Sequence, residues 1–200
     1  MKRLSDILGA LLMLLVTAPL VAGIAGAVLV SSGRPIFFRH QRVGRHGRTF
    51  RCLKFRTMVV DAEMWLSRDD ALGARHRAAG FKLPLREDPR VTPIGRFLRR
   101  TQLDELPQFW NVLVGQMSLV GPRPLVSEEL AWFDDAERQR LLSVRPGIFG
   151  PWTARGRGRP GYPERAKLDL SYVDRAGLKE DLRLLVAHLP VVFRGQADDA

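Results

Sequence analysis

The chain opens on an unbroken apolar segment. From Ile7 to Val30 there are 24 consecutive uncharged residues, ILGALLMLLVTAPLVAGIAGAVLV. A straight helix rising about 1.5 Å per residue would be long enough at this length to cross a hydrocarbon core of about 30 Å. The pattern therefore predicts a membrane-associated helix at the N-terminus.

A proline and two basic flanks complicate a simple span. Pro19 lies near the middle of the segment, where it removes a backbone donor and opposes a continuous helix. Lys2 and Arg3 precede the segment, and eight basic residues follow between Arg34 and Arg56 with no acidic residue among them. The positive-inside tendency places both flanks on the cytoplasmic side, which a re-entrant helix bent at Pro19 satisfies and a single span does not.

Three interpretations of this segment stay open on the sequence alone. The first is the re-entrant helix just described. The second is a true span, because proline kinks also occur in spanning helices, where other groups satisfy the freed carbonyls. The third is a cleaved signal peptide, with Met1 to Arg3 as its charged beginning.

Beyond the apolar segment, shorter patterns alternate. The stretches 36–38 and 49–55 predict strands around a turn-rich segment at 43–48. Helices are expected at 60–72, 94–100, 106–113, 127–142 and 178–189, and irregular structure at 81–93 and 155–163. The expected fold class is α+β, mostly helical with a short β-hairpin or small sheet.

Charge narrows the choice of partner. Thirty-two basic residues against 21 acidic ones give a formal charge of +11. Such a surplus points to an anionic partner: nucleic acid, an acidic lipid surface or a phosphorylated substrate. The single cysteine, Cys52, excludes an internal disulfide framework and a multi-cysteine zinc site.

The chemistry-bearing tract runs from Asp88 to Pro124. Adjacent carboxylates, Asp104 and Glu105, lie between arginines that precede and follow them, and Arg123 is held in the proline-stiffened sequence Gly-Pro-Arg-Pro. Guanidinium groups suit bidentate phosphate binding, and a carboxylate among them stays ionised, as a nucleophile or a ligand for a divalent cation. The tract therefore carries the elements of phosphoryl transfer.

A structural alternative explains the same residues. The sequence Thr101-Gln-Leu-Asp104 matches a capping box, in which an acidic residue near a helix N-terminus only satisfies backbone donors. The arginines would then form a solvated face that pairs with the carboxylates. On the local pattern alone this alternative is the stronger one.

A series of different short motifs follows one another along nearly the whole chain. They are Lys2-Arg3 with Asp6, Gln41 to Gly44 with Gly47, Lys54 to Met58, Asp88 to Arg90 with Thr92 and Gly95, Leu103 to Gln108 with Asn111 to Leu113, Met117 to Pro124, Arg145 to Gly147, and Leu168 to Leu170 with Tyr172-Val173 and Asp181-Leu182. Each motif is weak alone, but the ordered set is specific. It resembles the bacterial sugar transferases, the monotopic phosphoglycosyl transferases that start lipid-linked glycan assembly.

The resemblance implies a covalent mechanism. Asp104 would attack the phosphate that carries the sugar in a UDP-sugar and displace UMP. Polyprenyl (undecaprenyl) phosphate would then take the sugar phosphate from Asp104, giving a polyprenyl-diphosphate-linked sugar. Glu105 would assist, either through magnesium held by both carboxylates or by acting on the incoming phosphate.

The resemblance also implies a set of binding residues. Phosphate or substrate contacts are expected from Arg99, Arg123, Lys54, Arg56, Arg90 and Arg145. For Lys54 and Arg56, outward charges on a half-buried strand are an equal alternative, and for Arg145 the alternative is that it only holds a turn.

Two departures from the family pattern affect the bend and the sugar. Ala18 precedes the helix-breaking Pro19 where the family often has a small polar residue, which leaves the bend without a hydroxyl cap. The segment 151–159 differs from the common pattern and is unusually basic. Because sugar recognition is expected in such variable loops, the sugar is not assigned.

The resemblance sets location and partners. Residues 1–33 would form the membrane anchor, and residues 34–200 a catalytic domain on the cytoplasmic face of the bacterial inner membrane. The expected partners are a UDP-sugar, polyprenyl phosphate and membrane lipids, with no nucleic acid, and a homodimer is left open.

Two rivals come from other classes. A membrane-tethered basic nucleic-acid-binding protein would explain the charge of +11 and the arginine-glycine loop at 155–159. Against it, no nucleic-acid-binding module is recognisable, and the acidic pair opposes binding to a phosphate backbone. The second rival is a secreted basic protein whose first 23 or so residues are removed.

Overall fold

The computed structural model describes residues 2–78, 83–156 and 160–194. The α-helices are α1 (Lys2–Ser32), α2 (Ala62–Arg68), α3 (Asp70–Ala78), α4 (Pro93–Thr101), α5 (Gln108–Leu113), α6 (Asp135–Leu141), α7 (Glu164–Arg175) and α8 (Leu178–Arg194). The strands are β1 (Phe37–Val43), β2 (Thr49–Phe55), β3 (Ser118–Val120) and β4 (Gly147–Phe149). Short 3-10 helices are η1 (Arg45–Gly47), η2 (Leu103–Glu105), η3 (Ser127–Trp132) and η4 (Thr153–Arg155). The fold is mostly helical with two small sheets, which confirms the expected class.

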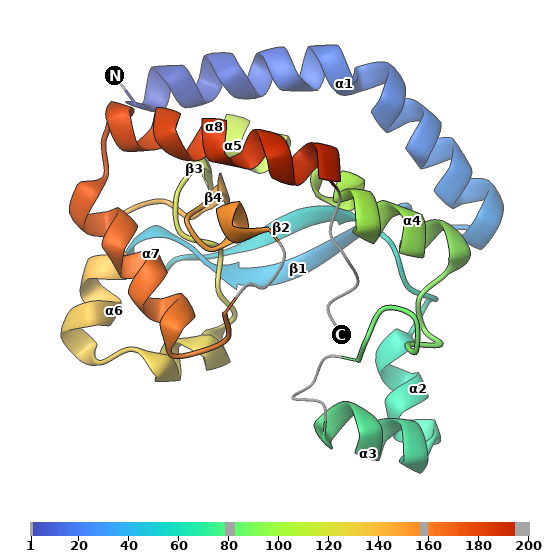
Figure 1. The fold of residues 1–200 in the computed structure, drawn as a ribbon. Coiled ribbons are helices and arrows are strands. Elements are labelled where there is room, and N and C mark those ends of the chain that lie inside the picture. Colours follow the sequence, from blue (N-terminus) through green and yellow to red (C-terminus); the bar gives the residue numbers. More distant parts are fainter. Residues whose placement is uncertain (1, 79–82, 157–159, 195–200) are drawn as a thin grey trace.

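The predicted hairpin is present. Strands β1 and β2 pair antiparallel from Phe37 opposite Phe55 to Val43 opposite Thr49, and η1 forms the connection. Phe50 and Cys52 point to the buried side of β2, where they pack with residues of α1 and α5. The hairpin therefore lies beneath α1 and supports the α5 segment (Figure 1).

A second, parallel pair joins β3 to β4. The two strands approach closely at two glycines: a Cβ on Gly147 would lie 2.0 Å from the backbone nitrogen of Gly121. Only glycine leaves room for this backbone contact. Strands of three residues carry too little alternation to be recognised in a sequence, so this sheet was not predicted.

Two predicted helices are each divided by an aspartate. The expected helix at 60–72 is α2 followed by α3, because Asp69 is extended and its Oδ1 accepts a hydrogen bond from Leu72 N at 2.9 Å. The expected helix at 127–142 is η3 followed by α6, because Asp134 accepts from Glu137 N at 2.8 Å. In both places the carboxylate caps a new helix N-terminus, so the helix restarts instead of continuing.

The other predicted elements agree with the structure except at one helix. The predicted helices at 94–100, 106–113 and 178–189 correspond to α4, α5 with its preceding turn, and α8. No helix at 164–175 was predicted, yet α7 forms there. Irregular structure was predicted at 81–93 and 155–163. Apart from the first residue of α4 and the last residue of η4, the described parts of these stretches contain no helix or strand. Residues 81–82 and 157–159 lie outside the described residues.

Helix α1 is continuous from Lys2 to Ser32, with Pro19 inside it. Its ribbon bends part-way along, so that the two arms follow the curved surface of the domain (Figure 1). The inner face buries Ala10, Ile24 and Val28. Pro19 thus produces a bend within one helix and does not separate two helices, as expected where a missing donor weakens a single turn.

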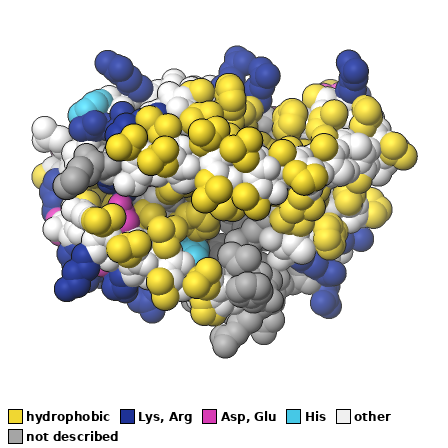
Figure 2. All heavy atoms as spheres, turned by 90° about the horizontal axis from the view of Figure 1, so that it is seen from above, with side chains coloured by type: hydrophobic (Ala, Val, Ile, Leu, Met, Phe, Trp, Pro, Cys, Tyr) yellow, Lys and Arg dark blue, Asp and Glu magenta, His cyan; other side chains and the backbone are white. Residues whose placement is uncertain are grey.

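The outer surface of α1 continues onto α8 as one apolar face. On α1 the exposed large apolar residues are Leu4, Leu8, Leu11, Leu12, Leu15, Val16, Leu20, Leu29 and Val30, and on α8 they are Leu178, Leu182, Val186 and Leu189. Figure 2 shows hydrophobic side chains gathered over this side, with basic groups around its rim. By length and composition α1 could cross a membrane, and an exposed apolar patch of this extent marks an interaction surface.

The β3–β4 contact yields a stability prediction. Gly147→Ala places a methyl group against the Gly121 backbone, so it should lower the free energy of unfolding by about 3 kcal/mol. Gly161→Ala is the matched control, because a Cβ there meets nothing within 4 Å. Thermal unfolding of the detergent-solubilised variants measures both, and equal midpoints would contradict the close approach.

Candidate active site

The acidic pair lies in a tight turn between two helices. Helix α4 ends at Thr101, Gln102 adopts a left-handed conformation (φ 58°), and η2 then carries Asp104 and Glu105. The Thr101 hydroxyl donates to the carbonyls of Phe97 and Leu98 inside its own helix. It caps no N-terminus, so the capping-box interpretation is wrong.

Glu105 accepts from two cations that come from distant parts of the chain. Lys54 Nζ on β2 donates to Glu105 Oε1 at 2.8 Å, and Arg123 Nη2, just after β3, donates to the same oxygen at 3.2 Å. All three side chains are at most 24% exposed. The structure therefore brings Lys54 and Arg123, two of the predicted phosphate-binding residues, together at the acidic pair.

Asp104 is the more deeply buried carboxylate, with 8% of its surface exposed. Among the described residues it makes no side-chain hydrogen bond, although Arg99, Lys54 and Arg123 all act on its charge. Arg99 is itself held in place, because its Nε donates to Thr57 Oγ1 at 2.8 Å. Asp104 is thus surrounded by cations, but no described side chain donates a hydrogen bond to its carboxylate oxygens.

The pKa values of the two carboxyl groups are shifted in opposite directions from their ordinary values. Burial raises the pKa of Asp104, and the negative charge of Glu105 raises it further, against the opposing effect of Lys54 and Arg99. Burial would also raise the pKa of Glu105, but Lys54 and Arg123 hold it well below its usual range. Glu105 is therefore ionised throughout the physiological range, whereas Asp104 gains a proton in mildly acidic solution.

Local sequence explains how α4 reaches this position. Thr92 caps α4 by accepting from Gly95 N at 3.0 Å, and Pro93 takes the first turn. A Cβ on Gly95 would lie 2.0 Å from the Thr57 carbonyl oxygen, so the helix start rests directly on the backbone after β2. This contact fixes Arg99, one turn of helix later, against the Thr57 hydroxyl.

The remaining predicted basic residues contact other groups. Arg56 donates to the backbone carbonyls of Ser32, Gly33 and Arg34 at the end of α1. Arg90 forms a buried bidentate pair with Asp88, at 2.8 and 2.7 Å. Arg145 Nε donates to the Gly115 carbonyl at 2.9 Å. In this structure each of these three holds a segment of backbone or a neighbouring turn.

The two carboxylates suit a hard cation. Magnesium prefers oxygen ligands and retains water and substrate phosphates, so it needs only one or two carboxylates from a protein. Asp104 and Glu105 supply such oxygens next to each other. In the described ranges there is no cluster of three or more His, Cys, Asp or Glu side chains placed to hold a metal. Two carboxylates are a donor set of the chemical type that magnesium accepts.

Comparison with known proteins decides the family. The sequence model described as bacterial sugar transferase matches residues 1–195, nearly the whole chain. This chain belongs to the bacterial sugar transferase family. The acidic pair and its three cations lie in the matched region, and α1 does as well.

Individual relatives of this sugar transferase are similar over almost all of its length. It is 41% identical over 197 residues to the undecaprenyl-phosphate galactose phosphotransferase of Salmonella typhimurium, covering 97% of this chain and 40% of that protein. It is 41% identical over 192 residues to the exopolysaccharide production protein ExoY of Sinorhizobium fredii, covering 96% and 84%. It is 35% identical over 207 residues to the UDP-glucose:undecaprenyl-phosphate glucose-1-phosphate transferase of Escherichia coli, covering 100% and 41%.

These findings bear on the rival classes. The chain spans less than half the length of the Salmonella and Escherichia relatives and most of the length of ExoY. The nucleic-acid-binding alternative receives no support from the family or from these relatives. The acidic pair and the basic residues around it lie within the region that the sugar transferase model matches.

The position of Lys54 at the acidic pair predicts how the pKa values of both carboxyl groups change when Lys54 is removed. Lys54→Met removes a cation that stabilises both carboxylate charges, so the pKa of Asp104 and that of Glu105 should rise. Carbon-13 NMR of labelled carboxyl groups in detergent measures this, with Asp104→Asn assigning the resonance. Arg145→Met removes an equal charge that faces a backbone carbonyl and should leave both titrations in place. Unchanged carboxyl titrations in Lys54→Met would contradict the arrangement.

Proposed function

We propose that this sugar transferase moves a sugar 1-phosphate from a UDP-sugar to polyprenyl (undecaprenyl) phosphate and releases UMP. The observation that carries the proposal is Asp104, a buried carboxylate without a hydrogen-bond partner among the described residues, placed within reach of three cations. Family membership supports the reaction class, and the names of the relatives include undecaprenyl-phosphate sugar phosphotransferases.

In the first step an Asp104 oxygen attacks the phosphorus that carries the sugar. The bond from that phosphorus to the bridging oxygen breaks, and UMP leaves with the electron pair. A sugar-phosphoryl aspartate results. Burial favours Asp104 for this role, because a carboxylate stripped of water and of hydrogen bonds keeps its electron density for the electrophile. Arg99 and Arg123 would bind the phosphate oxygens as charge builds on them.

In the second step a phosphate oxygen of polyprenyl phosphate attacks the same phosphorus. The bond to Asp104 breaks, the carboxylate is restored, and a polyprenyl diphosphate sugar is formed. Both reactants in a direct transfer would be anionic phosphates, so division into two steps lets the protein position and neutralise one at a time.

Glu105 acts as a charged group in this scheme. Because Lys54 and Arg123 hold its pKa low, it has no proton to give and is a weak base. This supports a role in fixing both cations and in holding magnesium, over a role in proton transfer. Magnesium, held by Glu105 with Asp104, would offset the charge of the substrate diphosphate.

The N-terminal end of α1 is attached to the globular body. Lys2 Nζ donates to Asp181 on α8 and to the Val120 carbonyl. Arg3 donates to the carbonyls at the end of α5, Val112 and Leu113. These contacts place the first turn of the anchor against the catalytic domain.

A buried carboxylate strengthens the same attachment. Asp6 accepts from the Ser118 hydroxyl at 2.9 Å and from Leu119 N at 3.0 Å, both on β3. At the other end of α1, Arg56 binds the last carbonyls, including that of Ser32. Both ends of the anchor therefore contact one body.

These attachments support a monotopic arrangement. A membrane span would carry Lys2 to the side opposite Ser32 and would break every contact of Lys2, Arg3 and Asp6 with the domain. A bent helix that enters and leaves through one leaflet keeps them, and it directs the apolar face of α1 and α8 to the lipid (Figure 2). The proposed location is the bacterial inner membrane, with Asp104 on the cytoplasmic side.

The proposal assigns the enzyme to the start of lipid-linked glycan or exopolysaccharide synthesis. Both expected substrates suit the geometry: a soluble nucleotide sugar arrives from the cytoplasm, and polyprenyl phosphate arrives from the lipid. A homodimer remains a prediction, and the sugar is to be found by experiment.

Asp104→Asn tests the chemistry. Because an amide cannot form the acyl phosphate, UMP release with a panel of UDP-sugars and polyprenyl phosphate should fall about a thousandfold or more. Asp135→Asn, a substitution on the exposed surface of α6, is the control and should retain activity. Thermal unfolding of both variants checks that they fold. Substantial turnover in Asp104→Asn would remove Asp104 from the role of nucleophile.

Cysteine labelling tests the topology. Cys52 is buried and burial raises the pKa of its thiol, so the native cysteine should stay silent. A cysteine in a tag before Met1 and a second one at the exposed turn, Arg48→Cys, should both resist an impermeant maleimide in intact spheroplasts and react after lysis. Labelling of the N-terminal tag alone in intact spheroplasts would establish a span.

A further inference from the structure

Among the described residues, two guanidinium groups lie over the ring of Trp152. Arg123 Cζ is 5.5 Å from the centre of the Trp152 ring, and Arg165 Cζ, from α7, is 4.8 Å from it. The indole Nε1 donates to the Pro160 carbonyl at 2.7 Å, which fixes the plane of the ring. Trp152 belongs to the segment 151–159 that departs from the family pattern, so this segment directly contacts a predicted phosphate-binding arginine.

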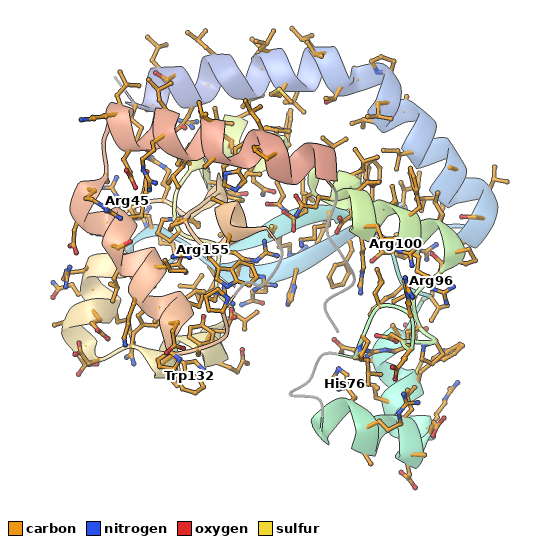
Figure 3. The ribbon with its side chains drawn as sticks, viewed as in Figure 1. Arg45, His76, Arg96, Arg100, Trp132 and Arg155 are labelled. Atoms are coloured by element: carbon orange, nitrogen blue, oxygen red, sulfur yellow. The ribbon has the colours of Figure 1, made fainter. Side chains whose placement is uncertain are left out.

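The guanidinium of Arg165 also contacts Glu129 and Tyr162. Arg165 Nη1 donates to Glu129 Oε1 at 2.6 Å, and Arg165 Cζ lies 5.0 Å from the centre of the Tyr162 ring. Trp132 stacks on Tyr162 in turn, with ring centres 5.2 Å apart. Figure 3 shows Trp132 at the end of the molecule remote from α1. The stack therefore extends from Arg123 away from the apolar face.

The buried side of Arg165 is held without hydrogen bonds. Its Nε and both carboxylate oxygens of Asp169 lack hydrogen-bond partners among the described residues, and Arg165 Nε lies 3.9 Å from Asp169 Oδ2. The bond to Glu129, the ion pair with Asp169 and the contacts with two rings therefore set the orientation of the Arg165 plane. Lysine at this position would keep the charge and lose the plane.

The proposed role of Arg123 in phosphate binding depends on the direction of its guanidinium. Arg123 reaches Glu105 with one nitrogen at 3.2 Å, and 24% of its side chain is exposed. An arginine fork recognises phosphate oxygens only when its plane and direction match them, and a free side chain adopts many rotamers. The Trp152 ring, over which Arg123 Cζ lies at 5.5 Å, limits that freedom before substrate arrives.

We propose that Trp152 and Arg165 are positioning residues that hold the Arg123 guanidinium toward the acidic pair and the substrate diphosphate. The inference rests on the proposed function only in naming that diphosphate as the ligand of Arg123. Arg123 lies over the ring of Trp152, and Arg165 packs against the same ring and holds it in place. Through this stack the unusual segment after Gly150 acts on phosphate binding.

The test is a double-mutant cycle. Trp152→Ala should lower kcat/KM for the UDP-sugar about tenfold in the wild-type background, and Arg165→Lys should lower it several-fold. In an Arg123→Ala background both substitutions should change the residual single-turnover rate by less than about twofold, because their effect passes through Arg123. Trp152→Phe, which retains a ring face, should restore most of the rate.

Controls separate positioning from folding. Trp65→Ala removes an exposed indole from α2 and should leave activity unchanged. If Trp152→Ala fails to fold, Arg165→Lys completes the cycle with Arg123→Ala. Equal losses in the wild-type and Arg123→Ala backgrounds would overturn the proposal, because they show an effect that does not involve Arg123.

A second readout distinguishes this inference from the proposed reaction. The same cycle is measured on the affinity for inorganic pyrophosphate by calorimetry, which requires no turnover. Weaker binding in Trp152→Ala that disappears in the Arg123→Ala background supports the positioning role, even if wild-type protein releases no UMP from any UDP-sugar. Additive effects on pyrophosphate binding would contradict it independently of the reaction.

Discussion

The site depends on one carboxylate oxygen that two cations share. Glu105 Oε1 joins Lys54 on the hairpin to Arg123 on the turn after β3, so three segments far apart in the chain meet at one atom. These groups are largely removed from water, and an unpaired charge among them would be costly. Because Glu105 satisfies both cations, neighbouring Asp104 remains without a hydrogen-bond partner in the described part of the chain. The pairing of Glu105 thus leaves the carboxylate of Asp104, the nucleophile that we propose, without a hydrogen bond from these cations.

The same strand links this pair to the anchor. Lys54 and Arg56 are two residues apart on β2 and its continuation, so they leave the chain on the same side, yet Lys54 reaches Glu105 and Arg56 reaches the carbonyls at the end of α1. The other end of α1 is held through Asp6 and Lys2. The helix that carries the apolar face and the residues around the acidic pair are therefore joined by direct contacts at both ends of α1.

The large positive charge has several distinct uses in the structure. Some arginines, such as Arg90 with Asp88, hold segments together through buried pairs. Others surround the acidic pair, where they lower the pKa of Glu105 and oppose the rise in that of Asp104. In the proposed stack, Arg165 acts on Arg123 indirectly, through the ring of Trp152. A net charge suggests an anionic partner, but only the contacts separate the arginines that meet substrate from those that fold the chain.

By itself the sequence determined the apolar helix with its proline, the hairpin and the helical character of the fold, because periodicity is a local property. Its ordered motifs named the acidic pair, Lys54, Arg99 and Arg123, but only the structure showed that Lys54 and Arg123 share one oxygen of Glu105. The local pattern at Asp104 favoured a capping box, and the family resemblance pointed to catalysis; the side-chain contacts of Thr101 then excluded the capping box. The sequence could not show that Arg56 binds the end of α1 or that Asp69 and Asp134 restart helices. The short β3–β4 pair and the stack on Trp152 were also decided by tertiary structure alone, because these contacts join residues that are distant in the chain and leave no periodic signal in it.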